Sequence, residues 1–227
     1  MLKDIPFNIK KSRRKTLSIY IERDGTVTVI APESLNDQEI KDVLKKKEYR
    51  IYKSLAEWEV TNTTKVDREY VNGQSFLYLG GNYRLKIVNG DQEKPLILKN
   101  GYFRLRKKDK AKANHMFKEF YKEKGYPKIV DRVERYKKRI VVNPKQIRIM
   151  ELKNRWASCS EKGNLNFHWK CIMAPPDVLS YIVAHELVHL VHKNHTKVFW
   201  NEIDKVVPNF QRHIEWLRIN GAAMDIM

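Results

Sequence analysis

The sequence is short of cysteine, of long apolar runs and of acidic residues. Its 227 residues include two cysteines, Cys159 and Cys171, which are too few for a disulfide framework and are expected to be reduced, buried thiols. No run approaches the roughly 18 apolar residues of a membrane span, and the first residues contain no apolar stretch suited to a signal peptide. We therefore expect a globular, cytoplasmic protein with no membrane partner.

The charge is strongly basic and unevenly spread. Only 27 Asp and Glu residues stand against 45 Lys and Arg residues, which gives a net charge of +18. The excess is concentrated between residues 107 and 148, where 15 basic residues accompany 5 acidic ones. Such a segment raises the local concentration of polyanions such as nucleic acid or nucleotide phosphates. A solvated, lysine-rich helix face explains the pattern equally well, so both interpretations stay open.

The first half of the chain is rich in short alternating runs. Residues 17–29 predict a β-hairpin with a tight turn. Residues 34–59 have an amphipathic pattern that predicts one helix, which begins near Ser34 or Asn36. Residues 70–106 alternate between short apolar runs and Gly or Asn-Gly turns, a pattern that predicts a meander of strands.

The second half predicts helices around a short sheet. The basic segment has a helical pattern that breaks at Gly125-Tyr126-Pro127. Residues 146–150 and 164–169 alternate as strands and are joined by a polar loop. The segment from Pro175 to Leu190 is apolar nearly all round, which predicts a buried helix.

These patterns together predict an α+β protein. We expect a strand-rich N-terminal region with one long helix at residues 1–106. A second region with a short sheet and the predicted buried helix is expected at residues 107–227, unless the two regions form one continuous domain. A linker near residues 60–70 is weakly marked.

The predicted buried helix carries the sequence His185-Glu186-Leu187-Val188-His189. Polar groups on such a helix need something that compensates their desolvation, and a metal ion does so. His185 and His189 are four residues apart, so both project from one face and can share a zinc ion. Glu186 points along an adjacent direction, where it can act as general base on a metal-activated water without being a ligand.

A catalytic zinc normally has three protein ligands and one open position, so a third ligand is needed. His195 reaches the metal if the chain leaves the helix near Asn194, a residue type that tolerates left-handed dihedral angles. Glu202 lies on a further predicted helix, residues 196–207, and can approach from the side. His192 lies one turn past the metal along the helix axis. The residues alone favour His195 and leave Glu202 and His192 open.

The second half of the chain resembles the YgjP-like metallopeptidase family, which is described as predicted metal-dependent hydrolases. The resemblance covers about residues 140–210 and is carried, in the family's order, by Asn154-Arg155-Trp156-Ala157-Ser158-Cys159-Ser160, Gly163-Asn164-Leu165-Asn166, Met173-Ala174-Pro175-Pro176, His185-Glu186-Leu187-Val188-His189 and Asn194-His195-Thr196-Lys197-Val198-Phe199-Trp200. It implies that residues 107–227 form a zincin-like catalytic region, with zinc on His185, His189 and His195. It also implies that Glu186 is catalytic. More distantly, the sequence resembles SprT and WLM proteases, which act on DNA-associated proteins.

Three functions fit these residues. The first is a zinc metallopeptidase that cleaves a peptide or protein substrate with Glu186 as general base. The second is a metal-dependent pyrophosphohydrolase that acts on nucleoside triphosphates, a role attributed to some of the proteins it resembles. The third is a DNA-associated accessory protein whose segment 107–148 binds nucleic acid beside a structural zinc. Arg155 is a candidate for binding a substrate carboxylate or phosphate, with a structural salt bridge as the alternative.

Overall fold

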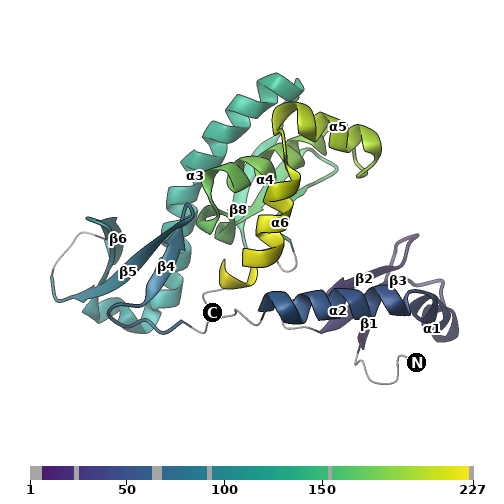
Figure 1. Ribbon diagram of the computed structural model, residues 1–227, viewed down its shortest axis with the longest axis horizontal. Coiled ribbons are helices and arrows are strands. Elements are labelled where there is room, and N and C mark those ends of the chain that lie inside the picture. Colours follow the sequence, from purple (N-terminus) through teal and green to yellow (C-terminus); the bar gives the residue numbers. More distant parts are fainter. Residues whose placement is uncertain (1–6, 23–25, 63–67, 91–93, 153–154, 225–227) are drawn as a thin grey trace. The chain divides into compact units, whose positions relative to one another are not determined.

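The computed structural model describes residues 7–22, 26–62, 68–90, 94–152 and 155–224 (Figure 1). The chain divides into two compact units, Met1–Lys65 and Val66–Met227, each with its own hydrophobic core. Several small sheets and six α-helices confirm the predicted α+β class. Within these ranges, no helix is long and apolar enough to cross a membrane.

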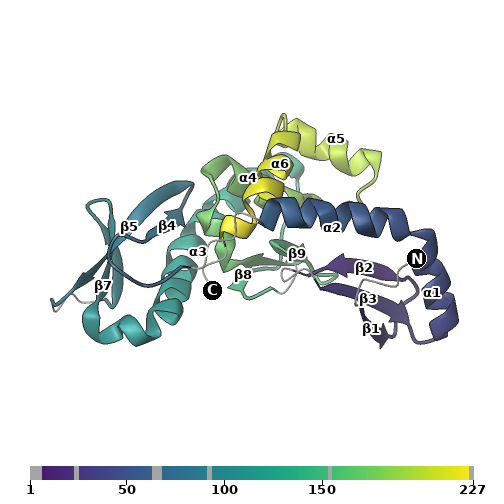
Figure 2. The ribbon, with the colours of Figure 1, turned by 60° about the horizontal axis from the view of Figure 1, so that its bottom comes forward.

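The first unit is a three-stranded sheet with two helices. Its elements are β1 (Phe7–Ser12), β2 (Ser18–Ile21), β3 (Val27–Pro32), α1 (Asp37–Lys46) and α2 (Glu48–Asn62). The central strand β3 pairs with β1 in parallel and with β2 in antiparallel orientation, so the predicted hairpin is confirmed (Figure 2). Its turn, at residues 23–25, lies outside the described residues.

The segment predicted as one helix forms two helices that meet at Lys47. Asn36 caps α1, because its side-chain oxygen accepts a hydrogen bond from the Glu39 N–H at 2.9 Å. The Glu39 carboxylate in turn accepts from the Asn36 N–H at 2.8 Å, which completes a capping box. This pair selects Asn36 rather than Ser34 as the start of the helix. The change of direction at Lys47 lets buried residues of both helices reach the same core.

The second unit begins with a four-stranded sheet. Its strands are β4 (Ser75–Tyr78), β5 (Gly81–Val88), β6 (Leu96–Lys99) and β7 (Tyr102–Arg106). Their order is β4-β5-β7-β6 with β5 and β7 parallel, so the predicted meander is wrong. Gly80 and Asn100-Gly101 do form tight turns, with φ values of 78°, 51° and 76°. These local turns specify two hairpins, but they do not specify which strand of the second hairpin pairs with the first.

A six-residue 3-10 helix, η2 (Lys107–Lys112), leads into the longest helix, α3 (Ala113–Ile140). The predicted break is wrong, because α3 continues through Pro127. Buried residues on both sides of the proline, among them Tyr121 and Ile129, hold the helix against the core despite the lost hydrogen bond. Gly125 permits close packing at this point: a Cβ atom there would lie 2.7 Å from Cγ1 of Ile172.

The four-stranded sheet and α3 share one core. Phe117 of α3 stacks on Phe76 of β4 with ring centroids 4.2 Å apart, and its ring lies 5.0 Å from that of Phe103 on β7. All three side chains are fully buried. The structure divides the chain at residue 65, within the range 60–70 where the sequence weakly marks a linker, and the expected change between residues 106 and 107 lies inside the second unit. The change from strand to helix pattern at 106 is a change of secondary structure within one core.

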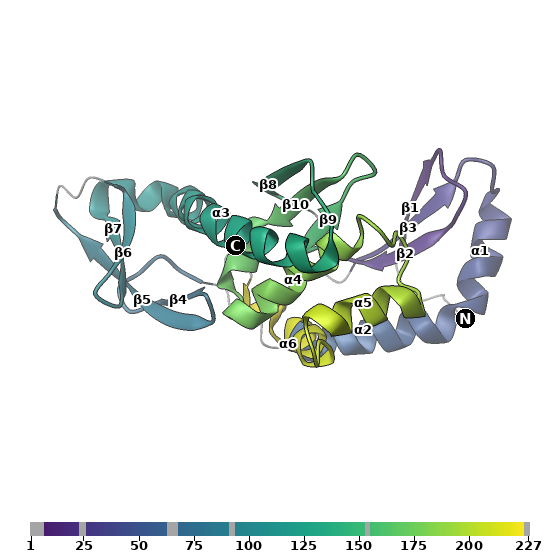
Figure 3. The same cartoon turned by 90° about the horizontal axis from the view of Figure 1, so that it is seen from above.

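The rest of the second unit forms a smaller sheet and three α-helices with two 3-10 segments. The elements are β8 (Gln146–Met150), β9 (Ala157–Cys159), β10 (Asn164–His168), η3 (Trp169–Met173), α4 (Pro176–Val188), α5 (Lys197–Val206), α6 (Gln211–Asn220) and η4 (Ala222–Met224). The sheet order is β8-β10-β9, which confirms the two predicted strands and adds β9 within the predicted loop. The helices α3, α5 and α6 pack around α4 (Figure 3).

The shared core predicts that Phe117→Ala lowers the free energy of unfolding of the second unit by about 3–5 kcal/mol, because it leaves a cavity at the centre of the core. Tryptophan fluorescence in a urea titration follows this unit, since four of the five tryptophans lie after residue 65. Tyr49→Ala is the control, at a residue of the first unit that is 82% exposed, and should change the value by less than about 0.5 kcal/mol. Equal, small effects of the two substitutions would contradict the shared core.

Candidate metal centre

The candidate site lies at the end of α4, a helix that is buried on nearly every side. Pro176 is its first residue, a position where a missing backbone N–H is tolerated. Val183, Ala184 and Leu187 have no exposed surface. The predicted buried helix is therefore confirmed, and the polar groups of its last turn are placed among apolar side chains.

Three histidines converge at this end of the helix. His185 is in the last turn of α4, His189 is the residue that caps it, and His195 lies in the loop before α5. Nε2 of His185 is 3.2 Å from Nε2 of His189 and 3.0 Å from Nε2 of His195. One nitrogen of each ring lies within 4.8 Å of the other two, so the three rings form a group able to hold a metal ion.

The loop that carries His195 turns back without a left-handed residue at Asn194. The four non-glycine residues with positive φ in the described ranges lie elsewhere, so the expected reason for the helix stop is wrong. The backbone tightens instead over residues 187–192, where N–H groups donate to carbonyls three and four positions back. This tightened turn ends the helix and returns the chain toward His185.

Loss of hydration disfavours the protonated, charged form of all three rings. Together with a smaller contribution from His189 and His195, it lowers the pKa of His185 to about 3. The pKa values of His189 and His195 are also lowered, first by burial. A neutral imidazole has a lone pair on one nitrogen, which is the form that binds a metal. A cation among the three facing nitrogens would satisfy all of them together.

The outer nitrogens of two rings have partners that orient them. Nδ1 of His189 lies 3.0 Å from the carbonyl oxygen of His192. Because a carbonyl only accepts hydrogen bonds, this Nδ1 carries the proton and Nε2 of His189 has the lone pair. Nδ1 of His185 lies 3.3 Å from the hydroxyl of Tyr181. His192 is a candidate ligand from the sequence, yet it contributes a backbone carbonyl, which no side-chain pattern reveals.

Glu186 follows His185 on α4 and is buried, with 6% of its surface exposed. Its Oε2 has no hydrogen-bond partner in the part of the chain that the structure describes. Burial raises the pKa of Glu186 to about 8, while the charge of Arg155 and a backbone hydrogen bond from Cys159 oppose the rise. A buried oxygen without a partner is costly for stability. A cation bound nearby would lower this pKa and favour the carboxylate form, which is the form that accepts a proton.

The donor set fits a divalent transition metal. Three imidazole nitrogens suit an ion such as zinc, and three protein ligands leave a coordination position open. An unpartnered carboxylate oxygen beside them suits a catalytic site better than a structural one, because a structural site has no need of a base. The residues present therefore accommodate a metal centre of hydrolytic type.

The other predicted site residues lie outside this group. Glu202 of α5 pairs with Lys205, with Oε1 and Nζ 2.6 Å apart, and is not one of the converging residues. Arg155 is exposed in the segment that leads into β9. It lies near enough to Glu186 for its charge to lower the pKa of that carboxyl group. Its contact with a substrate stays a prediction.

Three neighbours of the site were missed by the sequence patterns. Tyr181 contacts His185, as described above. The ring of Trp200 stacks on that of His195, with centroids 5.5 Å apart and planes 24° apart. Cys159, which is half-buried, brings a backbone N–H to Glu186. Aromatic and backbone contacts of this kind depend on how helices and strands pack, and only the helical spacing of Tyr181 and His185 is a signal within the sequence.

Several cations of the basic segment 107–148 make contacts within the chain. Arg132 donates to the carbonyl of Pro176, and Arg139 donates to the carbonyl of Val206. Further ion pairs on α3 are Lys122–Glu119, Arg135–Asp131 and Lys137–Glu134. The three ion pairs offset part of the positive charge of α3. Binding of a polyanion to this segment remains a prediction.

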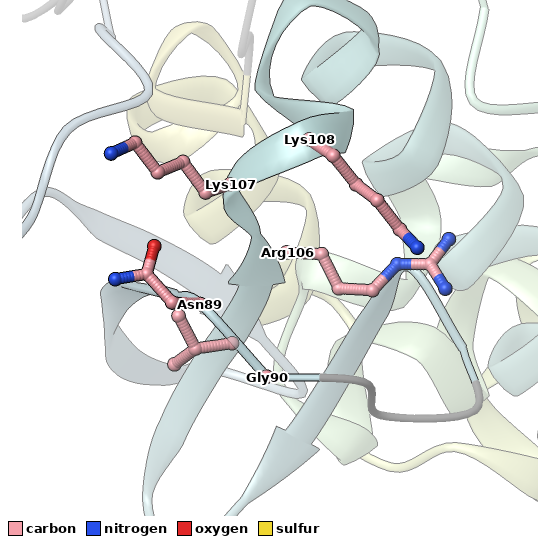
Figure 4. A pocket seen from close by; sticks show the side chains of 6 residues that line it. Asn89, Gly90, Arg106, Lys107 and Lys108 are labelled. Carbon is pink, nitrogen blue, oxygen red and sulfur yellow. The ribbon is translucent and has the colours of Figure 1, made fainter.

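A separate hollow of about 350 Å³ lies where the parallel strands β5 and β7 end. Its lining is basic and comprises Val88, Asn89, Gly90, Arg106, Lys107 and Lys108. In Figure 4, Asn89 and Lys107 extend to one side, whereas Arg106 and Lys108 extend to the other. The cationic groups therefore do not converge on one point in this view, and we assign the hollow no ligand.

Converging imidazoles beside a buried carboxylate define a metal-dependent hydrolase, and comparisons with known proteins give the family. The YgjP-like metallopeptidase domain matches residues 15–220, so the chain belongs to this family and the resemblance in its sequence is confirmed. The crystal structure of the metallopeptidase zymogen of Pyrococcus abyssi abylysin is similar over 44% of this chain and 98% of its own, with 26% identity and a TM-score of 0.38. A comparison with curated proteins found no match.

The geometry predicts that His195→Ala weakens zinc binding by at least about 100-fold, because even partners of the ligands typically contribute 10–100-fold. Metal content after zinc loading and dialysis, together with chelator competition, measures the effect. His192→Ala is the matched control: it removes a nearby ring but keeps the carbonyl that faces His189. Full zinc occupancy in His195→Ala would remove His195 from the site and make Glu202 the next candidate.

Proposed function

We propose that this protein is a zinc metallopeptidase that hydrolyses peptide bonds in a peptide or protein substrate. In this proposal His185, His189 and His195 hold the zinc ion, and Glu186 is the general base. The observations that carry it are the convergence of the three imidazoles and the buried, unpartnered Oε2 of Glu186, the residue that follows His185 in the last turn of α4. The family to which the chain belongs supports the same reaction.

Zinc is proposed from the chemistry of the donors. Sites with three histidines and an open position are common for catalytic zinc. A bound zinc ion would supply Lewis-acid chemistry, since it lowers the pKa of water to about 7 and polarises a substrate carbonyl. The protein contributes the fixed orientation of its ligands, which is set for His189 by the carbonyl of His192.

Glu186 is proposed to carry out the proton transfers. Its Oε2 accepts a proton from the attacking water and then delivers it to the amine nitrogen as the C–N bond breaks. The hydrogen bond from the Cys159 backbone holds the carboxylate in place during both steps. Because the side chain is buried, few water molecules compete for that proton.

The position of β9 supports a peptide as substrate. β9 is an edge strand of its sheet, and Ser160, just after it, donates to the carbonyl of Asn164 on the β10 side at 2.9 Å. The N–H of Cys159 is directed to Glu186 instead. Since alternate residues of a strand direct their backbone groups to opposite sides, the outer edge of β9 faces Glu186. An extended peptide that paired with this edge would place a peptide bond beside the base.

Arg155 is proposed to bind an anionic group of the substrate. It is exposed, lies two residues before the start of β9 and acts electrostatically on Glu186. A guanidinium group binds a carboxylate through two parallel hydrogen bonds, which would fix the substrate's register along the strand. The same group would bind a phosphate, so Arg155 does not by itself choose between a peptide and a nucleotide.

The nucleotide-hydrolase and nucleic-acid-binding alternatives stay predictions. The first would use the same metal site with Arg155 on the phosphates. The second would use segment 107–148, where several cations are paired within the chain. Binding to DNA that weakens steeply as salt is added would support the second alternative, since contacts between cations and phosphates release counterions.

The proposal predicts that Glu186→Gln lowers the rate of casein hydrolysis by about 10²–10⁴-fold, the usual contribution of a general base. Zinc content should remain that of the wild type, because Glu186 is not a ligand. Glu202→Gln is the matched control, at a glutamate whose partner is Lys205, and its rate should remain near that of the wild type.

A nucleotide panel assayed with the same three proteins separates the alternatives. Hydrolysis of casein but not of nucleoside triphosphates supports the peptidase. If only nucleotides are hydrolysed and Glu186→Gln abolishes this activity, the substrate is a nucleotide and Glu186 is still the general base. An undiminished rate of casein hydrolysis in Glu186→Gln would contradict the role of Glu186 as base.

A further inference from the structure

Tyr181 lies on α4 one turn before His185, and its side chain is directed to the same end of the helix. Its hydroxyl is 3.3 Å from Nδ1 of His185, on the opposite side of the ring from the nitrogen that faces His189 and His195. The residue is 6% exposed. It therefore contacts the ring of His185 from the side that faces away from the other two histidines.

The ring of Tyr181 is held between aromatic side chains from the region of α6. It stacks on Phe210 with centroids 6.4 Å apart and planes 10° apart. It also stacks on His213, at 6.0 Å and 25°. His213 is itself placed near Asp177 at the start of α4, with Nδ1 and Oδ2 3.7 Å apart. These contacts fix the plane of the Tyr181 ring and with it the position of the hydroxyl.

The other histidine of α4 shows what such a contact does. The carbonyl of His192 forces the proton of His189 onto Nδ1, so Nε2 is left with its lone pair. A hydroxyl can accept in the same way from Nδ1 of His185. If it does, both α4 histidines present Nε2 lone pairs toward the common centre, and neither ring can turn without losing a buried hydrogen bond.

We propose that Tyr181 is a positioning residue of the metal centre. Its hydroxyl accepts the Nδ1 proton of His185 and holds the Nε2 lone pair of that ring toward His189 and His195. The inference rests on the proposed function, in which these three rings are the metal ligands. In this proposal Tyr181 does not contact the substrate. The aromatic contacts from the region of α6 hold Tyr181 in position.

Two tyrosine-to-phenylalanine substitutions test the proposal on the full chain. Tyr181→Phe removes the hydroxyl and keeps the ring and its stacking. Tyr121→Phe is the matched control, because the buried hydroxyl of Tyr121 donates to the carbonyl of Leu77 at 2.7 Å, on α3 and away from the histidines. Each substitution removes one oxygen atom and one hydrogen bond from a buried aromatic side chain.

The zinc dissociation constant, measured by chelator competition, should rise about 10–100-fold in Tyr181→Phe, as is usual when a partner of a metal ligand is lost. It should be unchanged in Tyr121→Phe. Equal zinc affinity of Tyr181→Phe and the wild type would overturn the proposal. An equal loss in both variants would assign the effect to general destabilisation and would overturn it too.

A second measurement needs neither metal nor a substituted protein. Nitrogen-15 NMR of the imidazole rings in the metal-free wild type should show the proton of His185 on Nδ1. A proton on Nε2 would overturn the proposal. If the wild type binds no zinc, the proposed function fails, whereas the position of this proton still decides the role of Tyr181. The two failures are therefore distinguishable.

Discussion

The burial of polar groups in the last turn of α4 is the constraint on which the rest of the structure depends. Imidazole and carboxylate groups enter an apolar helix at a cost in hydration that other contacts must offset. Tyr181 and the carbonyl of His192 face the outer nitrogens of two rings, but the inner nitrogens face one another. Oε2 of Glu186 has no partner among the described residues. Contacts within the chain therefore offset only part of the hydration that these groups lose. A divalent cation, together with a reacting water and a substrate, would offset the rest.

The remainder of the second unit holds this helix still. α3 crosses α4 and anchors it through Arg132, which donates to the side chain of Ser180 as well as to the backbone of Pro176. The four-stranded sheet packs on the other part of α3 and so belongs to the same rigid core. β9 brings the Cys159 N–H to Glu186, and the region of α6 stacks on Tyr181. Sites built on packed helices and strands in this way keep their ligands within the tolerances that metal binding and catalysis require.

The sequence predicts the local features of the site well and its distant contacts poorly. Helical spacing places His185 and His189 on one face, and an all-apolar pattern predicts a buried helix, because both depend on neighbours within one turn. His195 is favoured by the same reasoning, although the expected left-handed residue at Asn194 is absent from the described backbone. The domain boundary, the order of β5 to β7 and the unbroken α3 depend on contacts between residues far apart in the chain. β9 has only three residues, too few for an alternating pattern to show.

The central claim is that three histidines, with no other protein side chain, bind a catalytic zinc ion. X-ray absorption at the zinc edge of the zinc-loaded full chain tests it most directly, because it reports the type and distance of the ligands around the metal. We expect three imidazole nitrogens at about 2.0–2.1 Å and one further light ligand. A sulfur ligand at about 2.3 Å, or fewer than three imidazoles, would contradict it.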